Sequence, residues 1–426
     1  MLFFQKCVKS IAKPYVVQAY SCKTITYSRS TVILGIETSC DDTGCAVIDG
    51  TGRLLGESLY SQTALHTRYG GVNPIFAHEL HRKNIDRAVT EALGKAGKSI
   101  KDIDVIAVTT KPGLFLSLQI GAKYARYLSR IHCIPLIPVH HMEAHALIPR
   151  MFHEVQFPYL VLLISGGHCL LALVKDVNDF LLLGKGLDNA PGEVLDKVAR
   201  RMKLKNILEY SQMCGGQAVE LAAKKSTNPG QFQFPLPLSK FRDCNFSFSG
   251  LKDSLVRKLI KKEIAHNVMG DEIIPEVYDL CAAFQLAVAE HIAHRTHRAM
   301  MFCDKNMLIN PDTKAIVVSG GVACNNFIFQ SIEHVGSKMG YKTYRPPPSV
   351  CTDNGVMIAW NGLEKLKKQF DIKTDFSLKE LNPEAPLGKN IISKGVIRTF
   401  ESSRFNASAR NSGFKARRSI LEAMFE

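Results

Sequence analysis

The sequence has no Cys-x-x-Cys pair and no long uninterrupted run of apolar residues, although 46% of its residues are hydrophobic. Its 12 cysteines are scattered along the chain, which suits a reducing compartment and does not indicate a disulfide framework. A membrane-spanning helix needs about 20 consecutive apolar residues. We therefore expect a globular chain that does not insert into a membrane.

Acidic residues are missing from residues 1–30, where serine and threonine are frequent. The basic residues of this segment are Lys6, Lys9, Lys13, Lys23 and Arg29. This composition is typical of a mitochondrial transit peptide, whereas a secretory signal needs a compact apolar core and a cleavage site of small residues. The segment predicts import into the mitochondrial matrix; a disordered basic terminus is the alternative.

Acidic residues are also outnumbered in the whole chain, because 39 Asp and Glu stand against 54 Lys and Arg, a formal net charge of +15. This charge favours an anionic partner, and nucleic acid is the first to test. Residues 388–418 contain eight basic residues and one acid, so we expect a flexible basic tail there. Other basic residues that could contact phosphates are Lys252, Arg257, Lys258, Lys261 and Lys262.

The motif His140–His145 follows a strand-like apolar run. His141 and His145 are four residues apart and would share one face of a helix. Two neutral imidazoles so placed can bind a divalent cation and leave room for a third protein ligand. Metalloproteases use a similar pair with a glutamate directly after the first histidine, but here Glu143 comes two residues after it and would point away. The motif predicts a metal site and argues against peptide hydrolysis; a helix start that merely carries histidines is the alternative.

Polar turns interrupt apolar strands at three places. The first hairpin has strands over residues 31–38 and 45–49 around the acidic turn Ser39–Gly44, and the second has strands over 159–164 and 169–174 around Ser165–His168. The third turn, Gly320–Gly321, follows a strand over residues 315–319 and leads into a helix. Such turns let a phosphate or ribose approach the backbone. The two similar hairpins suggest duplicated halves around a cleft.

Further elements follow from periodicity and turn residues. We expect helices over residues 73–93, 119–130, 189–202, 277–301 and 356–367, and a strand over 104–109. Cys214–Gly216 is expected to be a flexible turn, and Phe246–Lys252 an aromatic and serine loop.

Several motifs stand in a fixed order along the chain: GIETSCDDTG, HMEAH, LISGGH, GEVLDK, FSFSGLK, SGGVACN and CTDNG. Together they resemble the universal tRNA threonylcarbamoyladenosine synthase family, in its mitochondrial branch, over residues 32–367. The resemblance implies an α/β fold, the actin-like ATPase (ASKHA) superfold, with two duplicated subdomains around a nucleotide cleft. The expected parts are a transit peptide (1–30), a first subdomain (31–150), a second subdomain (151–350), a C-terminal helix returning to the first (351–385) and the basic tail (386–426).

The resemblance also implies an activity. The family transfers a threonylcarbamoyl group from threonylcarbamoyl-AMP to the exocyclic amine of the adenosine next to the anticodon, in tRNAs that read codons beginning with A. The implied partners are tRNA, a separate synthase that supplies threonylcarbamoyl-AMP, and a second copy of the chain in a homodimer. No enzyme nucleophile is needed, because the mixed anhydride is already activated. One divalent cation per subunit, Fe or Zn, would polarise the carbonyl.

Site residues are carried over by matching motifs. The implied metal ligands are His141, His145 and Asp353, which make a facial site. The implied adenylate contacts are Leu163, Ile164, Ser165, Gly166, Gly167, Asp196, Gly216 and Asn325. Asp41 and Asp42 match an acidic pair that is important in the family; either residue, or the substrate phosphate, could accept the amine proton.

Two positions depart from the family pattern. Asp42 stands where many members have glutamate, which shortens the reach of the carboxylate. Gln217 stands where proline usually follows the glycine pair, which puts Gly216 in doubt. Plainer roles also exist, since Asp196 could be a surface acid and Asn325 or Asp353 a helix cap.

Two other functions remain open on the sequence. The chain could be a nucleotide-gated, actin-like binding module without acyl transfer, or a metalloprotease, which only the histidine pair suggests. Incubation with threonylcarbamoyl-AMP and unmodified tRNA distinguishes the transferase from the binding module. A protease assay with a chelator control tests for the metalloprotease.

Overall fold

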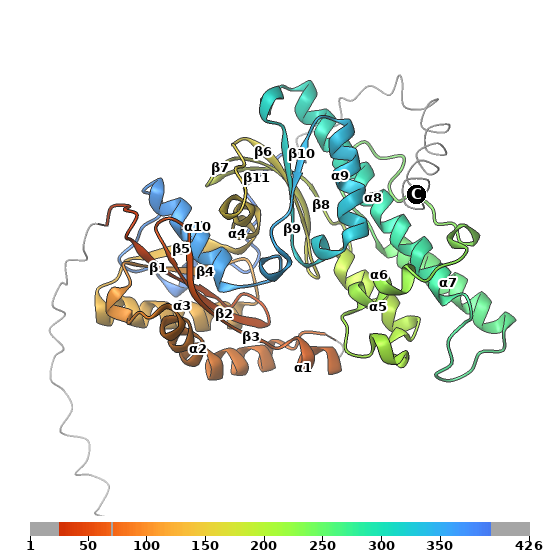
Figure 1. Ribbon diagram of the computed structural model, residues 1–426, viewed down its shortest axis with the longest axis horizontal. Helices are drawn as coiled ribbons and strands as arrows, with labels where there is room; N and C mark the ends of the chain where they lie inside the picture. Colours follow the sequence, from red (N-terminus) through yellow and green to blue (C-terminus); the bar gives the residue numbers. More distant parts are fainter. Residues whose placement is uncertain (1–24, 70, 393–426) are drawn as a thin grey trace, which may run out of the picture.

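The computed structural model describes residues 25–69 and 71–392, which form two α/β halves (Figure 1). The first half is built on a five-stranded sheet in the order β3-β2-β1-β4-β5. Its strands are β1 (Val32–Glu37), β2 (Asp42–Asp49), β3 (Leu54–Ser61), β4 (Val105–Lys111) and β5 (Leu136–His140). Most of their side chains are buried, so helices cover both faces of the sheet.

The second half is built on a six-stranded sheet in the order β10-β9-β6-β7-β8-β11. Its strands are β6 (Tyr159–Ile164), β7 (Cys169–Asp176), β8 (Asp179–Lys185), β9 (Ala315–Ser319), β10 (Lys342–Tyr344) and β11 (Lys389–Asn390). In each half, three antiparallel strands are followed by two parallel ones, and the strands occur in the same relative order. The duplicated halves expected from the two hairpins are therefore confirmed, and so is the actin-like fold that the family resemblance implies.

Helices divide the molecule into layers, which can be followed in Figure 1. The helices of the first half are α1 (Thr63–Arg68), α2 (Pro74–Ala96), α3 (Phe115–His132), α4 (His141–Leu147) and α10 (Gly355–Lys367). Those of the second half are α5 (Pro191–Arg201), α6 (Gly215–Ala223), α7 (Ser249–Ala265), α8 (Val277–Lys305) and α9 (Asn326–Lys338). In the described ranges, no helix is long and apolar enough to cross a membrane.

Alternation along the central strands assigns each side chain to a layer, because successive residues of a strand point to opposite faces. In β1, Leu34 packs toward α2 and α3, while Ile33 packs toward α10. In β6, Leu162 packs with the outer helices of the second half, while Val161 joins the same central core as Ile33. The central core thus contains α4 and α10 and is shared by the two sheets.

Helix α10 packs so closely against the first sheet that a Cβ at the glycines of the contact would clash with the backbone. A Cβ added at Gly35 in β1 would lie 2.4 Å from the carbonyl oxygen of Gly355, and one added at Gly44 in β2 would lie 2.7 Å from the nitrogen of Gly355. The helix follows β10 of the second sheet in sequence but packs on β1, β2 and β4 of the first. The segment from residue 345 to 354 therefore crosses from one half to the other.

Two local expectations were wrong. The glycine pair at residues 215 and 216 is the first turn of α6 rather than a flexible turn. A Cβ at Gly215 would lie 2.5 Å from Cα of Asp196, so α6 packs directly on α5 and this contact fixes the pair. The expected loop Phe246–Lys252 is a loop only in its first half, since α7 begins at Ser249.

The predicted leader and tail fall mostly outside the described residues. Residues 1–24 and 393–426 are not described, so the transit peptide and the flexibility of residues 393–426 stay predictions. The beginning of the predicted flexible tail is ordered instead, because Lys389–Asn390 forms β11 and pairs with β8. The last residues of the predicted leader do contact the fold, because the Tyr27 hydroxyl donates to the Gly50 carbonyl at 3.1 Å. A processed chain that begins before Tyr27 keeps this contact.

Candidate active site and metal centre

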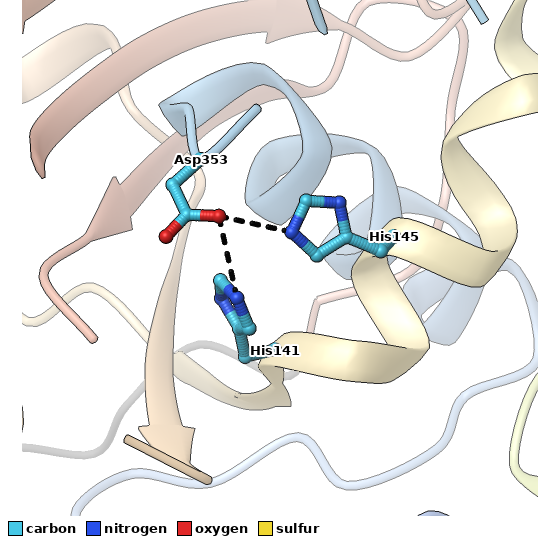
Figure 2. Close-up of side chains that lie close together, drawn as sticks. All are labelled: His141, His145 and Asp353. Atoms are coloured by element: carbon cyan, nitrogen blue, oxygen red, sulfur yellow. Dashed lines mark hydrogen bonds and ion pairs between the residues drawn. The ribbon is translucent and has the colours of Figure 1, made fainter. Parts of the chain in front are cut away.

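Two histidines and a carboxylate from distant parts of the chain point toward one another (Figure 2). His141 and His145 lie on α4, which begins where β5 ends, and Asp353 lies just before α10. Oδ1 of Asp353 is 3.0 Å from Nε2 of His145 and 3.4 Å from Nε2 of His141. One ligand atom from each residue lies within 4.8 Å of the others. Two imidazole nitrogens and a carboxylate oxygen suit Fe or Zn, so this cluster could hold one metal ion.

A buried carboxylate contacts His141 from the other side of its ring. Nδ1 of His141 lies 3.2 Å from Oε2 of Glu37 and 3.1 Å from Oγ of Ser39. Glu37 is the last residue of β1 and is 0% exposed. It also accepts hydrogen bonds of 2.5 Å from the Thr109 hydroxyl and the Ser39 amide. Because Nδ1 is engaged in this way, Nε2 is the nitrogen that His141 presents to the cluster.

The charges of the cluster fit a cation at its centre. Burial lowers the pKa of His141, but the Asp353 and Glu37 carboxylates overcome it and raise that pKa well above its usual value. The two imidazoles hold the pKa of Asp353 well below its usual range despite its burial. A metal ion would take the place of the His141 proton as the positive charge between two carboxylates.

Glu143 points away from this cluster, as its spacing predicted. It lies on α4 between the two histidines, and its carboxylate is 3.5 Å from Nζ of Lys365 on α10. Lys365 is itself buried and donates to the Pro138 carbonyl at 2.9 Å. Glu143 therefore stabilises the contact between α4 and α10, and it does not occupy the position of a protease base.

The glycine turns of the second half meet where β6 and β9 end. Gly320 has φ of 99°, and a Cβ there would lie 2.4 Å from the carbonyl oxygen of Ile164. Gly192, in the first turn of α5, approaches the same place, because its Cβ would lie 2.8 Å from the Ser165 carbonyl oxygen. Added Cβ atoms at Gly166 and Gly167 would meet nothing within 4 Å. Their backbone is open to a ligand at the carboxyl ends of parallel strands, where α/β proteins bind nucleotides.

The remaining residues predicted to contact the adenylate differ in which of their polar groups are left to bind a ligand. Leu163 and Ile164 are buried in β6, so only their backbone groups could serve a ligand. Asp196 accepts a 2.7 Å hydrogen bond from the Gly215 amide. Asn325 caps α9, with Oδ1 accepting from the Ile328 amide at 3.0 Å and Nδ2 lying 3.2 Å from Oε1 of Gln285. The plainer role considered for Asn325, a helix cap, is confirmed.

The segment that carries Asp353 adjoins these turns. Cγ2 of Thr352 lies 3.8 Å from the position of a Cβ at Gly321, so the residue before Asp353 touches the third glycine turn. His168 closes the second turn, its amide donating to Oγ of Ser165 at 3.0 Å. Burial and then the charge of His141 lower the pKa of His168 to about 4, so its imidazole is neutral near pH 7.

A sequence profile of the tRNA N6-adenosine threonylcarbamoyltransferase family matches residues 53–360. The chain belongs to this family. A relative from Danio rerio named "tRNA N6-adenosine threonylcarbamoyltransferase, mitochondrial" is 46% identical over 391 residues, 92% of this chain and 96% of the relative. The relative of the same name from Homo sapiens is 47% identical over 360 residues, 84% and 87% of the two chains.

Relatives outside the vertebrates extend the comparison. A threonylcarbamoyltransferase from Sinorhizobium medicae is 40% identical over 340 residues, 78% of this chain and 89% of the relative. The relatives from vertebrates, fly and plant are named as mitochondrial, and this member of the family is mitochondrial.

The acidic pair of the family pattern lies where the turn after β1 leads into β2: Asp41 ends the turn and Asp42 begins β2. Burial raises the pKa of Asp42 to about 7, helped by the negative charges of Asp41 and Asp353. Burial also raises the pKa of Asp41. One oxygen of Asp42 is buried and has no hydrogen-bond partner among the described residues. Asp42 therefore has the proton affinity of a base that works near neutral pH.

Sequence reasoning missed three residues of this site. Glu37, Ser39 and His168 stand inside the quoted motifs, but no local pattern assigns them a role. Glu37 is one charged residue at the end of an apolar strand, and that was the signal available: a carboxylate in a buried strand must find a partner. Its partner is a histidine 104 residues away in sequence.

Proposed function

We propose that this chain transfers the threonylcarbamoyl group from threonylcarbamoyl-AMP to N6 of the adenosine next to the anticodon, in mitochondrial tRNAs that read codons beginning with A, and releases AMP. The observation that carries the proposal is the convergence of His141, His145 and Asp353 beside the glycine turns of β6 and β9. A metal-ligand set beside backbone groups that are open to a ligand is what an adenylate with a transferable acyl group requires.

His141, His145 and Asp353 would hold the cation, and Glu37 would hold the ring of His141. When bound, the cation supplies Lewis-acid polarisation of the carbonyl. Backbone groups of residues 163–167 would bind the AMP part, with Asp196 and Gly216 near the ribose. Asn325 would contribute through its backbone or a remaining lone pair, because its carboxamide already caps α9.

The bond changes follow from the mixed anhydride. The adenosine N6 attacks the carbamoyl carbon, the bond from that carbon to the phosphate oxygen breaks, and AMP leaves. The proton lost by N6 must go to a base, and we favour Asp42 over Asp41 because its pKa of about 7 matches neutral conditions. To reach the Asp42 carboxylate, the adenosine must leave the base stack of the anticodon loop.

Transfer is tested directly with purified protein, threonylcarbamoyl-AMP and unmodified tRNA, followed by mass analysis of the nucleosides. We expect the wild type to form the threonylcarbamoylated nucleoside and both His141→Ala and Asp353→Ala to lose nearly all transfer and part of their bound metal. His78→Ala, on the outer helix α2, is the matched control. Normal transfer by both site variants would refute the metal assignment, and nucleotide closure without transfer would favour the binding-module alternative.

The partners belong to the same proposal. We infer that a separate synthase supplies threonylcarbamoyl-AMP from threonine, bicarbonate and ATP, that the chain works as a homodimer, and that residues 1–30 direct import. Light scattering of the purified protein tests the dimer. Import assays with a chain that starts at residue 25 test the leader while keeping the contact between Tyr27 and Gly50.

A further inference from the structure

The loop over residues 237–243 turns its carbonyl oxygens inward, onto two arginines of α8. The guanidinium of Arg295 donates to four of these oxygens, those of Pro237 at 3.3 Å, Leu238, Phe241 at 3.0 Å and Asp243 at 2.9 Å. Arg298, about one turn further along α8, donates to the carbonyl oxygens of Asp243, at 3.1 Å, and of Arg242. One face of α8 therefore holds the loop through its backbone.

This support is rigid because the arginine at its centre is buried. Arg295 is 0% exposed, and a buried charge is stable only when hydrogen bonds satisfy it, so the loop cannot move away without leaving the guanidinium unpaired. Leu238 has φ of 51°, a left-handed conformation that leucine keeps only where its surroundings impose it. One turn earlier on α8, Nε2 of His291 accepts a hydrogen bond from the Ser247 amide at 3.0 Å. The described residues 237–243 belong to no helix or strand, yet their backbone is fixed.

The outer side of the loop carries an aromatic ring between two basic side chains. Phe241 is 59% exposed, and its neighbours Lys240 and Arg242 are exposed as well. The one acid of the loop, Asp243, is turned inward, with Oδ1 3.9 Å from Nη1 of Arg295. Aromatic rings stack on unpaired bases, and lysine and arginine bind the phosphates of the same strand. The outer side therefore has the chemistry of a contact for single-stranded nucleic acid.

The chain after the loop runs to the edge of the second sheet that carries the glycine turn Ser165–His168. Lys185, at the end of β8, pairs with Leu170 of β7, so β8 ends beside this turn. The Phe246 amide donates to the Lys185 carbonyl oxygen at 3.0 Å, which places Phe246 at the same edge. Phe241 comes five residues before Phe246. A strand of RNA with one base in the site can therefore extend its neighbouring nucleotides toward the loop.

We propose that the loop 237–243 binds a single-stranded segment of the substrate tRNA, with an unpaired base stacked on Phe241 and phosphates of the same strand beside Lys240 and Arg242. The net charge of +15 and the two cations beside the ring favour RNA over a protein partner. Because the backbone of the loop is already fixed, little ordering is needed when the strand binds. The identity of the strand as tRNA rests on the proposed function, whereas binding of single-stranded RNA by the loop does not.

Binding is tested with the full-length protein and a fluorescently labelled anticodon stem-loop RNA, without threonylcarbamoyl-AMP. We expect Phe241→Ala and Phe241→Leu each to raise the dissociation constant about 5- to 100-fold, as the loss of one stacked base does, and Phe241→Trp to bind like the wild type. Lys240→Ala should lower the slope of the salt dependence by about 0.7, the value for one phosphate contact to a single strand. Tyr127→Ala, which removes an equally exposed ring from α3, is the matched control and should bind normally.

The Phe241→Trp variant also reports stacking directly. The one tryptophan of the chain, Trp360, is buried, so quenching that RNA adds in this variant comes from position 241. We expect quenching by the stem-loop and none by inorganic phosphate. Thermal unfolding of all variants should match the wild type, because the substituted side chains lie on the surface.

Three outcomes would overturn the proposal. Unchanged RNA affinity of Phe241→Ala would remove the loop from the interface, and an equal loss in Tyr127→Ala would show that the effect is not specific to it. Normal binding by Phe241→Leu would exclude a stacked base. A change of oligomeric state in Phe241→Ala with unchanged RNA affinity would assign the loop to a protein contact instead. A wild type that binds RNA through the loop but never transfers would count against the proposed function and leave the RNA contact standing.

Discussion

Glu37 shows how one side chain of an apolar strand can set the chemistry of a residue on another element. Its carboxylate contacts Nδ1 of His141 and is itself fixed by the Thr109 hydroxyl and the Ser39 amide. Each of these partners lies on a different segment of the first half. The position of the His141 ring therefore depends on the whole edge formed by β1, β4 and the acidic turn.

Replacing Glu37 with glutamine should weaken metal binding while the fold is kept. The amide has the same shape but no charge, so it cannot stabilise a cationic centre or raise the basicity of His141 as a ligand. We expect a loss of about 10–100-fold in metal affinity, measured by competition with a chelator and by metal content after dialysis.

Glu57→Gln is the control for this substitution. Glu57 is exposed on β3 of the same sheet, and its variant should bind metal like the wild type. Equal metal affinity of Glu37→Gln and Glu57→Gln would mean that Glu37 is only a packing residue.

Alkylation of Cys324 should depend on pH near neutrality. Its pKa is lowered to about 7, so the thiolate fraction, and with it the iodoacetamide rate, rises through pH 7 and levels off above pH 8. Peptide-resolved mass spectrometry measures the rate at each pH. Arg345→Gln removes a positive charge that favours the thiolate and should move the midpoint upward; an unchanged midpoint would show that this charge does not act on Cys324.

Among the elements, α5 and α6 give the sharpest test of packing. A Cβ at Gly215 would lie 2.5 Å from Cα of Asp196, whereas the nearest atom to a Cβ at Gly216 is Cδ1 of Leu195 at 3.7 Å. We expect Gly215→Ala to lower the free energy of unfolding by about 1–3 kcal/mol, as overpacking does, and Gly216→Ala to stay within about 1 kcal/mol of wild type. Denaturant unfolding of both variants measures this, and equal stabilities would contradict the close contact.

Local patterns predicted elements well where a single run of sequence determines the structure. The two hairpins, the helices that contain His81, Asp196 and Trp360, and the placement of His141 and His145 on one face all follow from periodicity and turn residues. The second strand of the first hairpin begins at Asp42, three residues earlier than expected, because β3 pairs with β2 along its full length and extends it.

Long-range contacts could not be predicted in this way. Asp353 reaches His145 across 208 residues, and only the family resemblance connected them. The glycine pair at 215 and 216 looked like a flexible turn, since nothing local shows that Asp196 lies against it.

At the scale of the whole molecule, the net charge of +15 raises the question of which basic residues bind tRNA phosphates. Among the lysines of α7 that the sequence nominated, Lys262 pairs with Glu276 and Lys258 lies over the Phe234 ring at 5.4 Å. Arg257 and Lys261 on the same helix are exposed. These two are the better candidates for contacts with tRNA phosphates.

Charge reversal at Arg257 and Lys261 together should weaken tRNA binding and flatten its salt dependence by about one unit of slope for each lost phosphate contact. Binding of an adenylate analogue should not change, because α7 lies outside the glycine turns. Filter binding across a salt series and calorimetry measure the two affinities. Lys98→Glu with Lys101→Glu, exposed on the first half, is the matched control, and an equal effect of both pairs would point to nonspecific attraction.

The burial of α10 has a consequence for how the protein is made. Twelve of its 13 residues are buried, and they cover a face of strands that the ribosome completes more than two hundred residues earlier. During synthesis, one apolar face of the first sheet therefore stays uncovered until the ribosome has made α10. A premature stop before residue 353 removes this cover and the candidate metal ligand Asp353 together, so we expect shortened chains to be cleared by chaperones and proteases instead of persisting as partly active enzyme.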